Sequence, residues 1–159
     1  YISRKTKMAI DRAREGIAEI INADKDEIFF TSGGSESDNW ALKGIAMANG
    51  KKGKHIITTE IEHHAILNTC KYLEKHGFEI SYLPVDEYGT VSLQELNKAI
   101  RKDTVLVSVM FANNEIGTIE PIKDIGKLCR ERGMLFHTDA VQAVGNIPID
   151  VQDIYKEGD

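Results

Sequence analysis

The stretch Thr104-Val-Leu-Val-Ser-Val-Met110, followed by Phe111-Ala-Asn-Asn-Glu-Ile-Gly117, decides the fold of this 159-residue chain. Residues 104–110 are nearly all apolar, which is typical of a parallel-sheet strand that is covered on both faces. The chain then turns polar at Asn113, Asn114 and Glu115. Ligands of open α/β sheets bind beyond the carboxyl ends of the strands, so this transition predicts a crevice at that edge.

A second segment, Met134-Leu-Phe-His-Thr-Asp-Ala-Val-Gln-Ala-Val-Gly145, repeats the arrangement. Here Asp139 and Gln142 follow a short apolar strand. We expect these two side chains to converge on the same crevice as the polar residues that follow Met110. A buried carboxylate in such a place needs a cationic partner.

Helical and strand patterns alternate along the whole chain. Strands are expected at residues 27–31, 54–59, 78–83, 104–110 and 134–138, and helices around residues 8–20 and at 35–48, 64–76, 92–100 and 121–132. Repeated βα units with short loops predict an α/β fold, with a mostly parallel sheet and helices on both faces. No linker, repeat or low-complexity segment interrupts the pattern, so we expect one domain or part of one.

The composition argues against several classes of partner. The formal charge is −5 and the Lys and Arg residues are scattered, so neither a nucleic-acid nor a membrane-surface partner is expected. No apolar run reaches transmembrane length and no signal-peptide pattern opens the chain, which predicts a cytoplasmic protein.

The two cysteines, Cys70 and Cys129, lie far apart and lack metal-ligand spacing, so no metal site or disulfide framework is predicted. Each shares helical spacing with apolar residues, and we interpret both as core residues without a catalytic role.

The motif Thr31-Ser-Gly-Gly-Ser-Glu-Ser-Asp38 places two glycines between an expected strand and a helix start. Glycines let the backbone approach an anion, and a helix N-terminus favours negative charge, so Gly34 and Ser35 are candidates for a phosphate cradle. The alternative is a plain helix cap, in which Ser35 pairs with Asp38. The motif matches neither the P-loop nor the dinucleotide fingerprint.

The motif Glu60-Ile-Glu-His-His64 follows the expected strand 54–59 and opens a helix. Adjacent histidines point in different directions, so only one is expected to reach a shared crevice. Metal ligation, an exposed helix start, and a histidine that lies against an aromatic ligand or moves protons are all compatible with this motif.

Four ordered segments together resemble the pyridoxal-phosphate-dependent cysteine desulfurases of the iron–sulfur-cluster and nitrogen-fixation type, which are class V aminotransferase-like enzymes. They are Phe30-Thr-Ser-Gly-Gly-Ser-Glu-Ser-Asp-Asn39, Glu62-His-His-Ala-Ile-Leu67, Asn113-Asn-Glu-Ile-Gly117 and His137-Thr-Asp-Ala-Val-Gln-Ala-Val-Gly145. The resemblance spans the whole chain and implies the fold type I large domain of such enzymes.

The resemblance also implies site roles, with pyridoxal 5'-phosphate as the cofactor. Gly34 and Ser35 would hold the phosphate, where the family commonly has Ala-Thr. His63 would stack on the pyridine ring and take part in proton transfer, and Asp139 would pair with the ring nitrogen. Asn114 and Gln142 would bond the ring oxygen.

The activity implied is the conversion of L-cysteine to L-alanine and an enzyme-bound persulfide, by a homodimer that passes sulfur to an iron–sulfur scaffold protein or another acceptor. The family's Schiff-base lysine, in a Ser-x-His-Lys motif, and its persulfide cysteine have no counterpart in residues 1–159. We therefore expect this chain to be part of the large domain and, by itself, inactive. Two alternatives stay open: a selenocysteine lyase or other class V enzyme, and a truncated, inactive interaction module.

Overall fold

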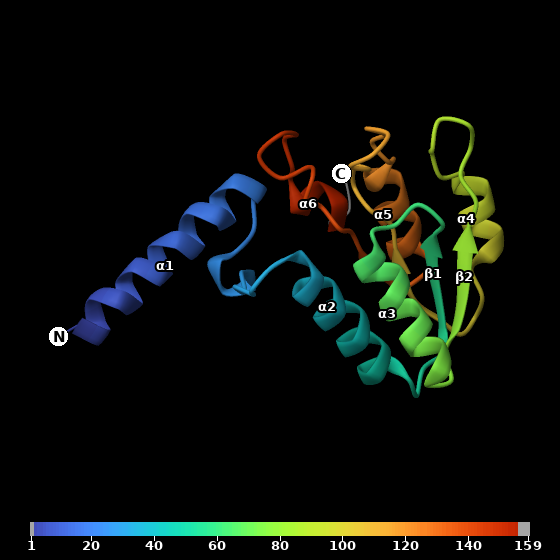
Figure 1. Ribbon diagram of the computed structural model, residues 1–159, viewed down its shortest axis with the longest axis horizontal. Helices are drawn as coiled ribbons and strands as arrows, with labels where there is room; N and C mark the ends of the chain where they lie inside the picture. The colour runs from blue at the N-terminus through green and yellow to red at the C-terminus, as the bar shows by residue number, and fades with distance from the viewer. Residues whose placement is uncertain (1, 156–159) are drawn as a thin grey trace.

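The apolar run that begins at Thr104 forms strand β3 (Thr104–Ser108), which is buried along its whole length. Strand β1 (His55–Thr59) is equally buried and pairs with β3 in parallel. β2 (Glu79–Leu83) pairs with β1, and β4 (Leu135–His137) pairs with β3, so the order is β2-β1-β3-β4. This computed structural model describes residues 2–155 and confirms the predicted parallel sheet (Figure 1).

Helices connect the strands and cover both faces of the sheet, as predicted (Figure 1). The helices are α1 (Ile2–Ile21), α2 (Gly34–Asn49), α3 (His64–Lys75), α4 (Leu93–Ala99), α5 (Ile122–Glu131) and α6 (Val151–Tyr155), with a short 3₁₀ turn η1 (Lys25–Glu27). Helices α2 and α3 pack on one face, whereas α4, α5 and α6 pack on the other.

The alternation of side chains along the strands produces two separate cores. Because neighbouring strand residues point to opposite faces, Ile56 and Leu106 enter the core under α2 and α3. Ile57 and Val107 enter the core under the other three helices. This double coverage explains why β1 and β3 are continuously buried.

The strand expected at residues 27–31 is wrong. Residues 25–27 form the turn η1, in which Asp24 and Glu27 make a reciprocal capping box, and residues 28–31 pair with no described strand. Phe29 is 65% exposed and meets Trp40 edge-on, with ring centroids 5.6 Å apart. The apolar, β-favouring residues of this segment thus pack against a helix rather than enter the sheet.

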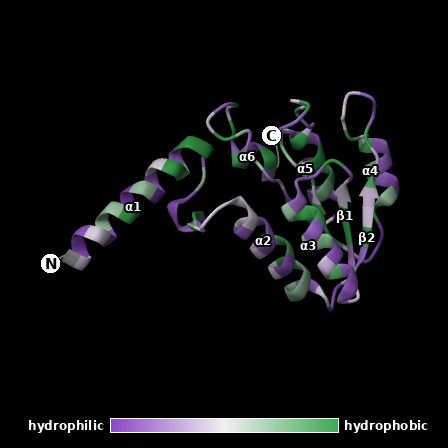
Figure 2. Cartoon of the chain, viewed as in Figure 1, coloured by the Kyte–Doolittle hydropathy of each residue, from purple (hydrophilic) through white to green (hydrophobic). Residues whose placement is uncertain are grey.

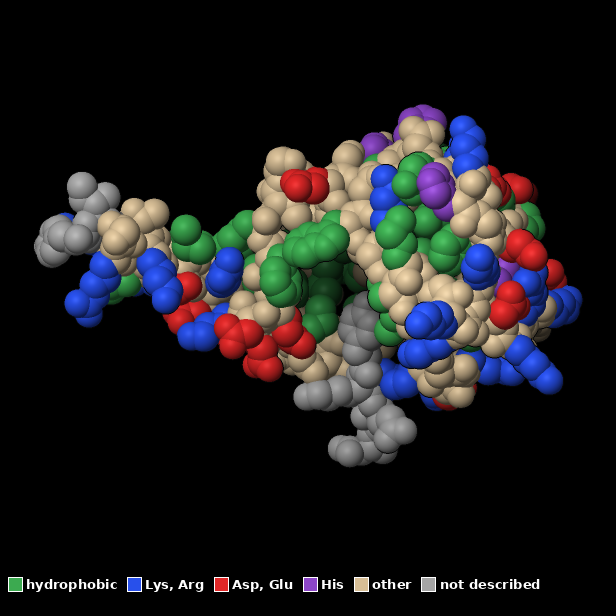
Figure 3. All heavy atoms as spheres, turned by 90° about the horizontal axis from the view of Figure 1, so that it is seen from below, with side chains coloured by type: hydrophobic (Ala, Val, Ile, Leu, Met, Phe, Trp, Pro, Cys, Tyr) green, Lys and Arg blue, Asp and Glu red, His purple; other side chains and the backbone are tan. Residues whose placement is uncertain are grey.

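Helix α1 projects away from the body of the molecule (Figure 1). Apolar and polar residues alternate along it in bands (Figure 2), and Met8 and Ile20 are among its exposed apolar side chains. Seen from below, apolar side chains also gather around a hollow between the projecting helix and the body (Figure 3). No helix within residues 2–155 combines the length and apolar content that a membrane span requires.

Candidate functional site

A cavity of about 260 Å³ lies where the chain leaves β1, β3 and β4. It is lined by Gly34, Ser35, Asp38, His63, Met110, Ala112, Asn114, Asp139, Val141 and Gln142. All the residues that the sequence assigned to a cofactor site are among them. Of the strand-end polar residues expected to converge on one crevice, Asn114, Asp139 and Gln142 do so, whereas Asn113 and Glu115 do not line it. The sequence motifs did not assign Asp38, Met110, Ala112 or Val141.

A larger cavity of about 500 Å³ lies elsewhere, at the amino-terminal edge of β3 and β4, and includes Arg101 and Arg132. Arg101 already donates to Asp103 and Glu79, and Arg132 donates to Asn97. Ligands of parallel sheets bind at the carboxyl edge, so the smaller cavity is the better candidate despite its size.

The start of α2 forms one wall of the smaller cavity. Gly33 is the N-cap and Gly34 the first helical residue, so the N–H groups of Gly34 and Ser35 lie in the turn where a helix offers them no carbonyl partner. A Cβ atom on Gly34 would lie 3.0 Å from Cγ2 of Val141. The Val141 side chain would therefore have to shift by a few tenths of an ångström to admit a Cβ atom at this position.

The alternative pairing of Ser35 with Asp38 as a helix cap is wrong. Asp38 is buried, and Ser35 lies inside the helix rather than at its cap. The N-cap Gly33 makes no side-chain capping bond, and Glu36 in the first turn accepts from the N–H and the hydroxyl of Ser32, both at 2.6 Å. These hydrogen bonds lower the pKa of Glu36, and Ser35 itself lines the cavity.

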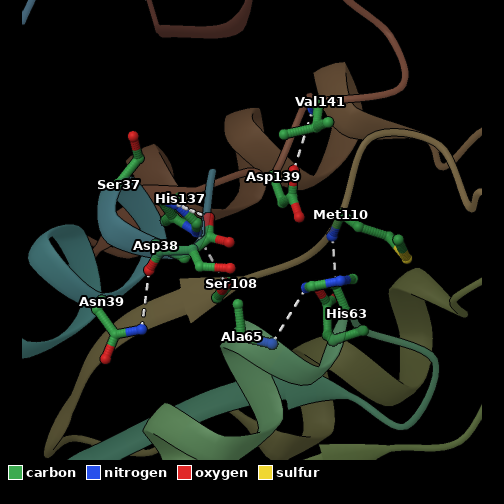
Figure 4. Close-up of polar contacts among 12 residues, drawn as sticks. Ser37, Asp38, Asn39, His63, Ala65, Ser108, Met110, His137, Asp139 and Val141 are labelled. Atoms are coloured by element: carbon green, nitrogen blue, oxygen red, sulfur yellow. Dashed lines mark hydrogen bonds and ion pairs between the residues drawn. The ribbon is translucent and has the colours of Figure 1, made fainter. Parts of the chain in front are cut away.

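Of the two adjacent histidines, only His63 lines the cavity. It is the N-cap of α3, and its Nδ1 accepts from the N–H of Ala65 at 3.1 Å (Figure 4). Since Nδ1 is an acceptor, Nε2 carries the proton in the neutral ring. This hydrogen bond fixes the ring at the point where the chain leaves β1, and it confirms the expectation that one of the pair faces the crevice.

The two adjacent asparagines have different surroundings. Asn113 is buried; it donates to the carbonyl of Ile61 at 3.1 Å and accepts from the N–H groups of Glu115 and Ile116. It therefore builds the turn that follows β3. Asn114, the exposed neighbour, lines the cavity.

Asp139 and Gln142 lie in the segment that follows β4. Oδ1 of Asp139 accepts from the N–H of Val141 at 3.0 Å, which orients the carboxylate (Figure 4). Gln142 accepts a hydrogen bond from Asn146 through its backbone carbonyl, at 3.1 Å, so its side-chain amide is not used in that contact. Both side chains line the cavity.

Behind Asp139, a buried polar chain joins α2 to the sheet. Nδ1 of His137 lies 2.9 Å from Oγ of Ser108, and its Nε2 lies 3.7 Å from Oδ1 of Asp38. Burial lowers the pKa of His137 to about 4, so the ring is neutral at neutral pH and its contact with Asp38 is not an ion pair between full charges. Burial also raises the pKa of Asp38 to about 6, with a further contribution from Asp139.

The Glu62 side chain links the ends of β1 and β3 by hydrogen bonds beneath the cavity. Its Oε1 accepts from the hydroxyl of Thr59 at 2.8 Å and from the N–H of Met110 at 2.9 Å. Burial raises the pKa of Glu62 to about 8, which makes it a neutral acid at neutral pH. It positions Met110, one of the residues that line the cavity.

The charges of the cavity suit a ligand with an anionic and a cationic end. The first turn of α2 attracts an anion, whereas Asp38 and Asp139 attract a cation. No Lys or Arg occurs among the described residues that line it. Within residues 2–155, no group of three or more His, Cys, Asp or Glu side chains is arranged to hold a metal ion. The phosphate and the protonatable ring nitrogen of pyridoxal phosphate fit this distribution of charge.

Comparisons with known proteins find similar sequences and solved structures over nearly the whole chain. A relative from Clostridium botulinum (strain Kyoto / Type A2), named cysteine desulfurase IscS, is 66% identical over 96% of this chain. The chain spans only 38% of that relative's length. Among solved structures, a NifS-like protein matches 97% of this chain with a TM-score of 0.93 and 43% identity, and the match covers 43% of that structure.

A structure described as SspA in complex with cysteine matches equally well, with a TM-score of 0.93 and 44% identity over 97% of this chain and 45% of the other. The likeness therefore extends to solved structures of the same α/β fold. The profile of the aminotransferase class-V family matches residues 2–155, which is nearly the whole chain. With its fold, its strand-end cavity and this match, the chain belongs to the aminotransferase class-V family.

Proposed function

We propose that this chain supplies the cofactor-binding site of a pyridoxal-phosphate-dependent cysteine desulfurase. The reaction takes L-cysteine and an enzyme thiol to L-alanine and an enzyme persulfide. The observation that carries the proposal is the single cavity that gathers the start of α2, His63, Asn114, Asp139 and Gln142. The high identity with a relative named cysteine desulfurase supports the choice of reaction.

Each wall of the cavity has a distinct binding task in this proposal. The N–H groups of Gly34 and Ser35, with the Ser35 hydroxyl, would bind the phosphate. The carboxylate of Asp139, oriented by Val141, would accept a hydrogen bond from the protonated ring nitrogen. Asn114 and Gln142 would bond the ring oxygen. The bound cofactor supplies an electron sink for bond breaking at the substrate α-carbon.

His63 would combine stacking with proton transfer. Because Nδ1 is held by the N–H of Ala65, Nε2 is the nitrogen that would hold or pass a proton at the cavity. The same hydrogen bond fixes the ring plane, so that the imidazole would lie against a flat ligand without losing its orientation. His64 lacks a position on the cavity and would have no such role.

Neither cysteine of residues 1–159 is expected to supply the thiol that attacks the substrate sulfur. Cys70 and Cys129 are fully buried, and burial raises the pKa of each to about 12, which disfavours the reactive thiolate. We infer that residues 1–159 form part of the large cofactor domain, and that the Schiff-base lysine and the persulfide cysteine belong to other parts of the complete protein.

The activity is tested with the complete protein that contains this chain. Loaded with pyridoxal phosphate, it should form alanine and protein-bound persulfide from L-cysteine in equal amounts during a single turnover. Preference for L-selenocysteine at equal concentration would instead assign a selenocysteine lyase. Absence of both reactions, with the cofactor bound, would contradict the proposal.

We also propose the partners that this activity implies. The complete protein would be a cytoplasmic homodimer that passes persulfide sulfur to an iron–sulfur scaffold protein or another acceptor. The exposed apolar side chains around α1 and Trp40 are compatible with burial against further protein surface. Sedimentation equilibrium would give the mass of the assembly, and a monomer at micromolar concentration would contradict the dimer.

A further inference from the structure

Asp38 is a second carboxyl group at the cavity, in addition to Asp139. It lies on α2, is only 5% exposed, and lines the same cavity. His137, which does not line the cavity, contacts Asp38 and is held in turn by Ser108. Figure 4 shows these three side chains gathered between α2 and the end of β4, with Asp139 on the segment that follows.

A Ser–His–Asp order can also form a nucleophilic triad, but the burial of Ser108 excludes that role here. Ser108 is fully buried in the central strand β3, out of reach of a substrate. Nδ1 of His137 pairs with the Ser108 hydroxyl, and its Nε2 lies 3.7 Å from Oδ1 of Asp38. Ser108 therefore activates no nucleophile, and the group of the three that reaches the cavity is the carboxyl group of Asp38.

No Lys or Arg lies beside Asp38 among the described residues that line the cavity. His137 is neutral because burial lowers its pKa to about 4. Glu62, beneath the cavity, is a neutral acid whose pKa is raised to about 8, mainly by burial and in small part by Asp139. The charged side chain that acts on Asp38 is Asp139, which raises its pKa together with burial. The repulsion between the two carboxylates is mutual.

We propose that Asp38 is a positioning residue that acts through Asp139 to favour the protonated ring nitrogen of the bound cofactor. Two carboxylates that repel each other bind a nearby proton or cation more strongly than either would alone. A protonated pyridine nitrogen at Asp139 relieves this repulsion. The inference rests on the proposed function, since it requires pyridoxal phosphate in the cavity.

The test measures the protonation of the cofactor's ring nitrogen directly. The complete protein is loaded with pyridoxal phosphate that carries nitrogen-15 in the ring, and the nitrogen chemical shift is recorded against pH. Asp38→Asn, which has the same shape without the charge, should lower the pKa of the ring nitrogen by about one unit. It should also weaken cofactor binding about tenfold at pH 8, with a smaller effect at pH 5, where Asp38 itself takes up a proton.

Matched variants separate charge from structure. Asp38→Glu keeps the charge and should restore most of the ring-nitrogen pKa. Ser108→Ala removes the hydrogen bond to His137 but keeps both carboxylates, and it should leave that pKa unchanged. If Asp38→Asn does not fold, Asp38→Ser removes the charge with a smaller side chain and is held to the same expectation.

An unchanged ring-nitrogen pKa and affinity in the charge-removing variant would overturn the inference while the proposed function stands. Equal shifts in Asp38→Asn and Ser108→Ala would also overturn it, because packing rather than charge would then be responsible. Failure of the wild-type protein to bind pyridoxal phosphate would remove the proposed function and, with it, this inference.

Discussion

The backbone N–H of Met110 donates a hydrogen bond to Oε1 of Glu62 at 2.9 Å and joins the ends of two neighbouring strands beneath the cavity. Glu62 is 5% exposed, and its Oε2 has no hydrogen-bond partner among the described residues. Burial raises the pKa of this carboxyl group to about 8 from an ordinary value near 4.5. The contact is thus made by a protonated side chain at neutral pH.

This contact predicts how stability changes with pH. Between about pH 4.5 and 8, the folded state keeps a proton on Glu62 that the unfolded state releases, so the free energy of unfolding falls as the pH rises. Glu62→Gln mimics the protonated acid. Urea unfolding should show similar stability for variant and wild type at pH 5 and a more stable variant at pH 8. A difference that does not change with pH would contradict the assignment of a neutral Glu62.

Asp139 is predicted to act in the reaction more than in binding. Asp139→Ala should reduce alanine formation by roughly a hundredfold or more, since protonation of the ring loses its partner. Part of the cofactor should stay bound, because the phosphate wall at Gly34 and Ser35 is intact. Absorbance spectra and an alanine assay measure the two effects. The control is Asp153→Ala, because this exposed aspartate lies outside the cavity and is paired with Lys123. Near-normal turnover of Asp139→Ala would contradict the proposed role of Asp139.

Matched variants of the two adjacent histidines test which of them acts at the cavity. His63→Ala should impair turnover far more than His64→Ala, because only His63 lines the cavity. The Ala65 N–H also loses its acceptor in the first variant, so the stability of each protein is measured alongside its activity. Equal losses of turnover in two stably folded variants would contradict the proposed role of His63.

Much of this architecture is visible in the sequence because it depends on local patterns. The apolar run 104–110 and the polar residues that follow it predict both the parallel strand and its binding edge. Features that depend on contacts between residues far apart in the sequence could not be predicted in this way. Asp38 lies on an early helix, and only folding brings it within 3.7 Å of His137. Likewise, Asn113 and Asn114 are the same residue type, and only the turn after β3 separates their roles.

The error at residues 27–31 has a related cause. Two consecutive phenylalanines in an apolar run favour a strand by propensity, but a strand also needs a neighbour to pair with. Phe29 finds Trp40 of α2 instead, and Arg14 of α1 lies over the ring of Phe30, 5.5 Å from its centroid. Tertiary contacts therefore override the local pattern here.

Gly53, just before β1, provides a test of the fold itself. A Cβ atom at this position would lie 2.1 Å from the carbonyl oxygen of Asp103, a backbone atom that cannot move aside alone. Gly53→Ala should therefore cost about 2 kcal/mol or more of unfolding free energy. Gly16→Ala on α1, where nothing lies within 4 Å, should cost none. Thermal unfolding compares the two, and equal stabilities would contradict the close approach of residues 53 and 103.

The most direct test of the central claim is an experimental structure of the complete protein with pyridoxal phosphate bound. We predict the phosphate at the N–H groups of Gly34 and Ser35, the ring against His63, and the ring nitrogen about 2.8 Å from a carboxylate oxygen of Asp139. Pyridoxal phosphate bound away from the cavity, or with its ring nitrogen out of reach of Asp139, would contradict the account.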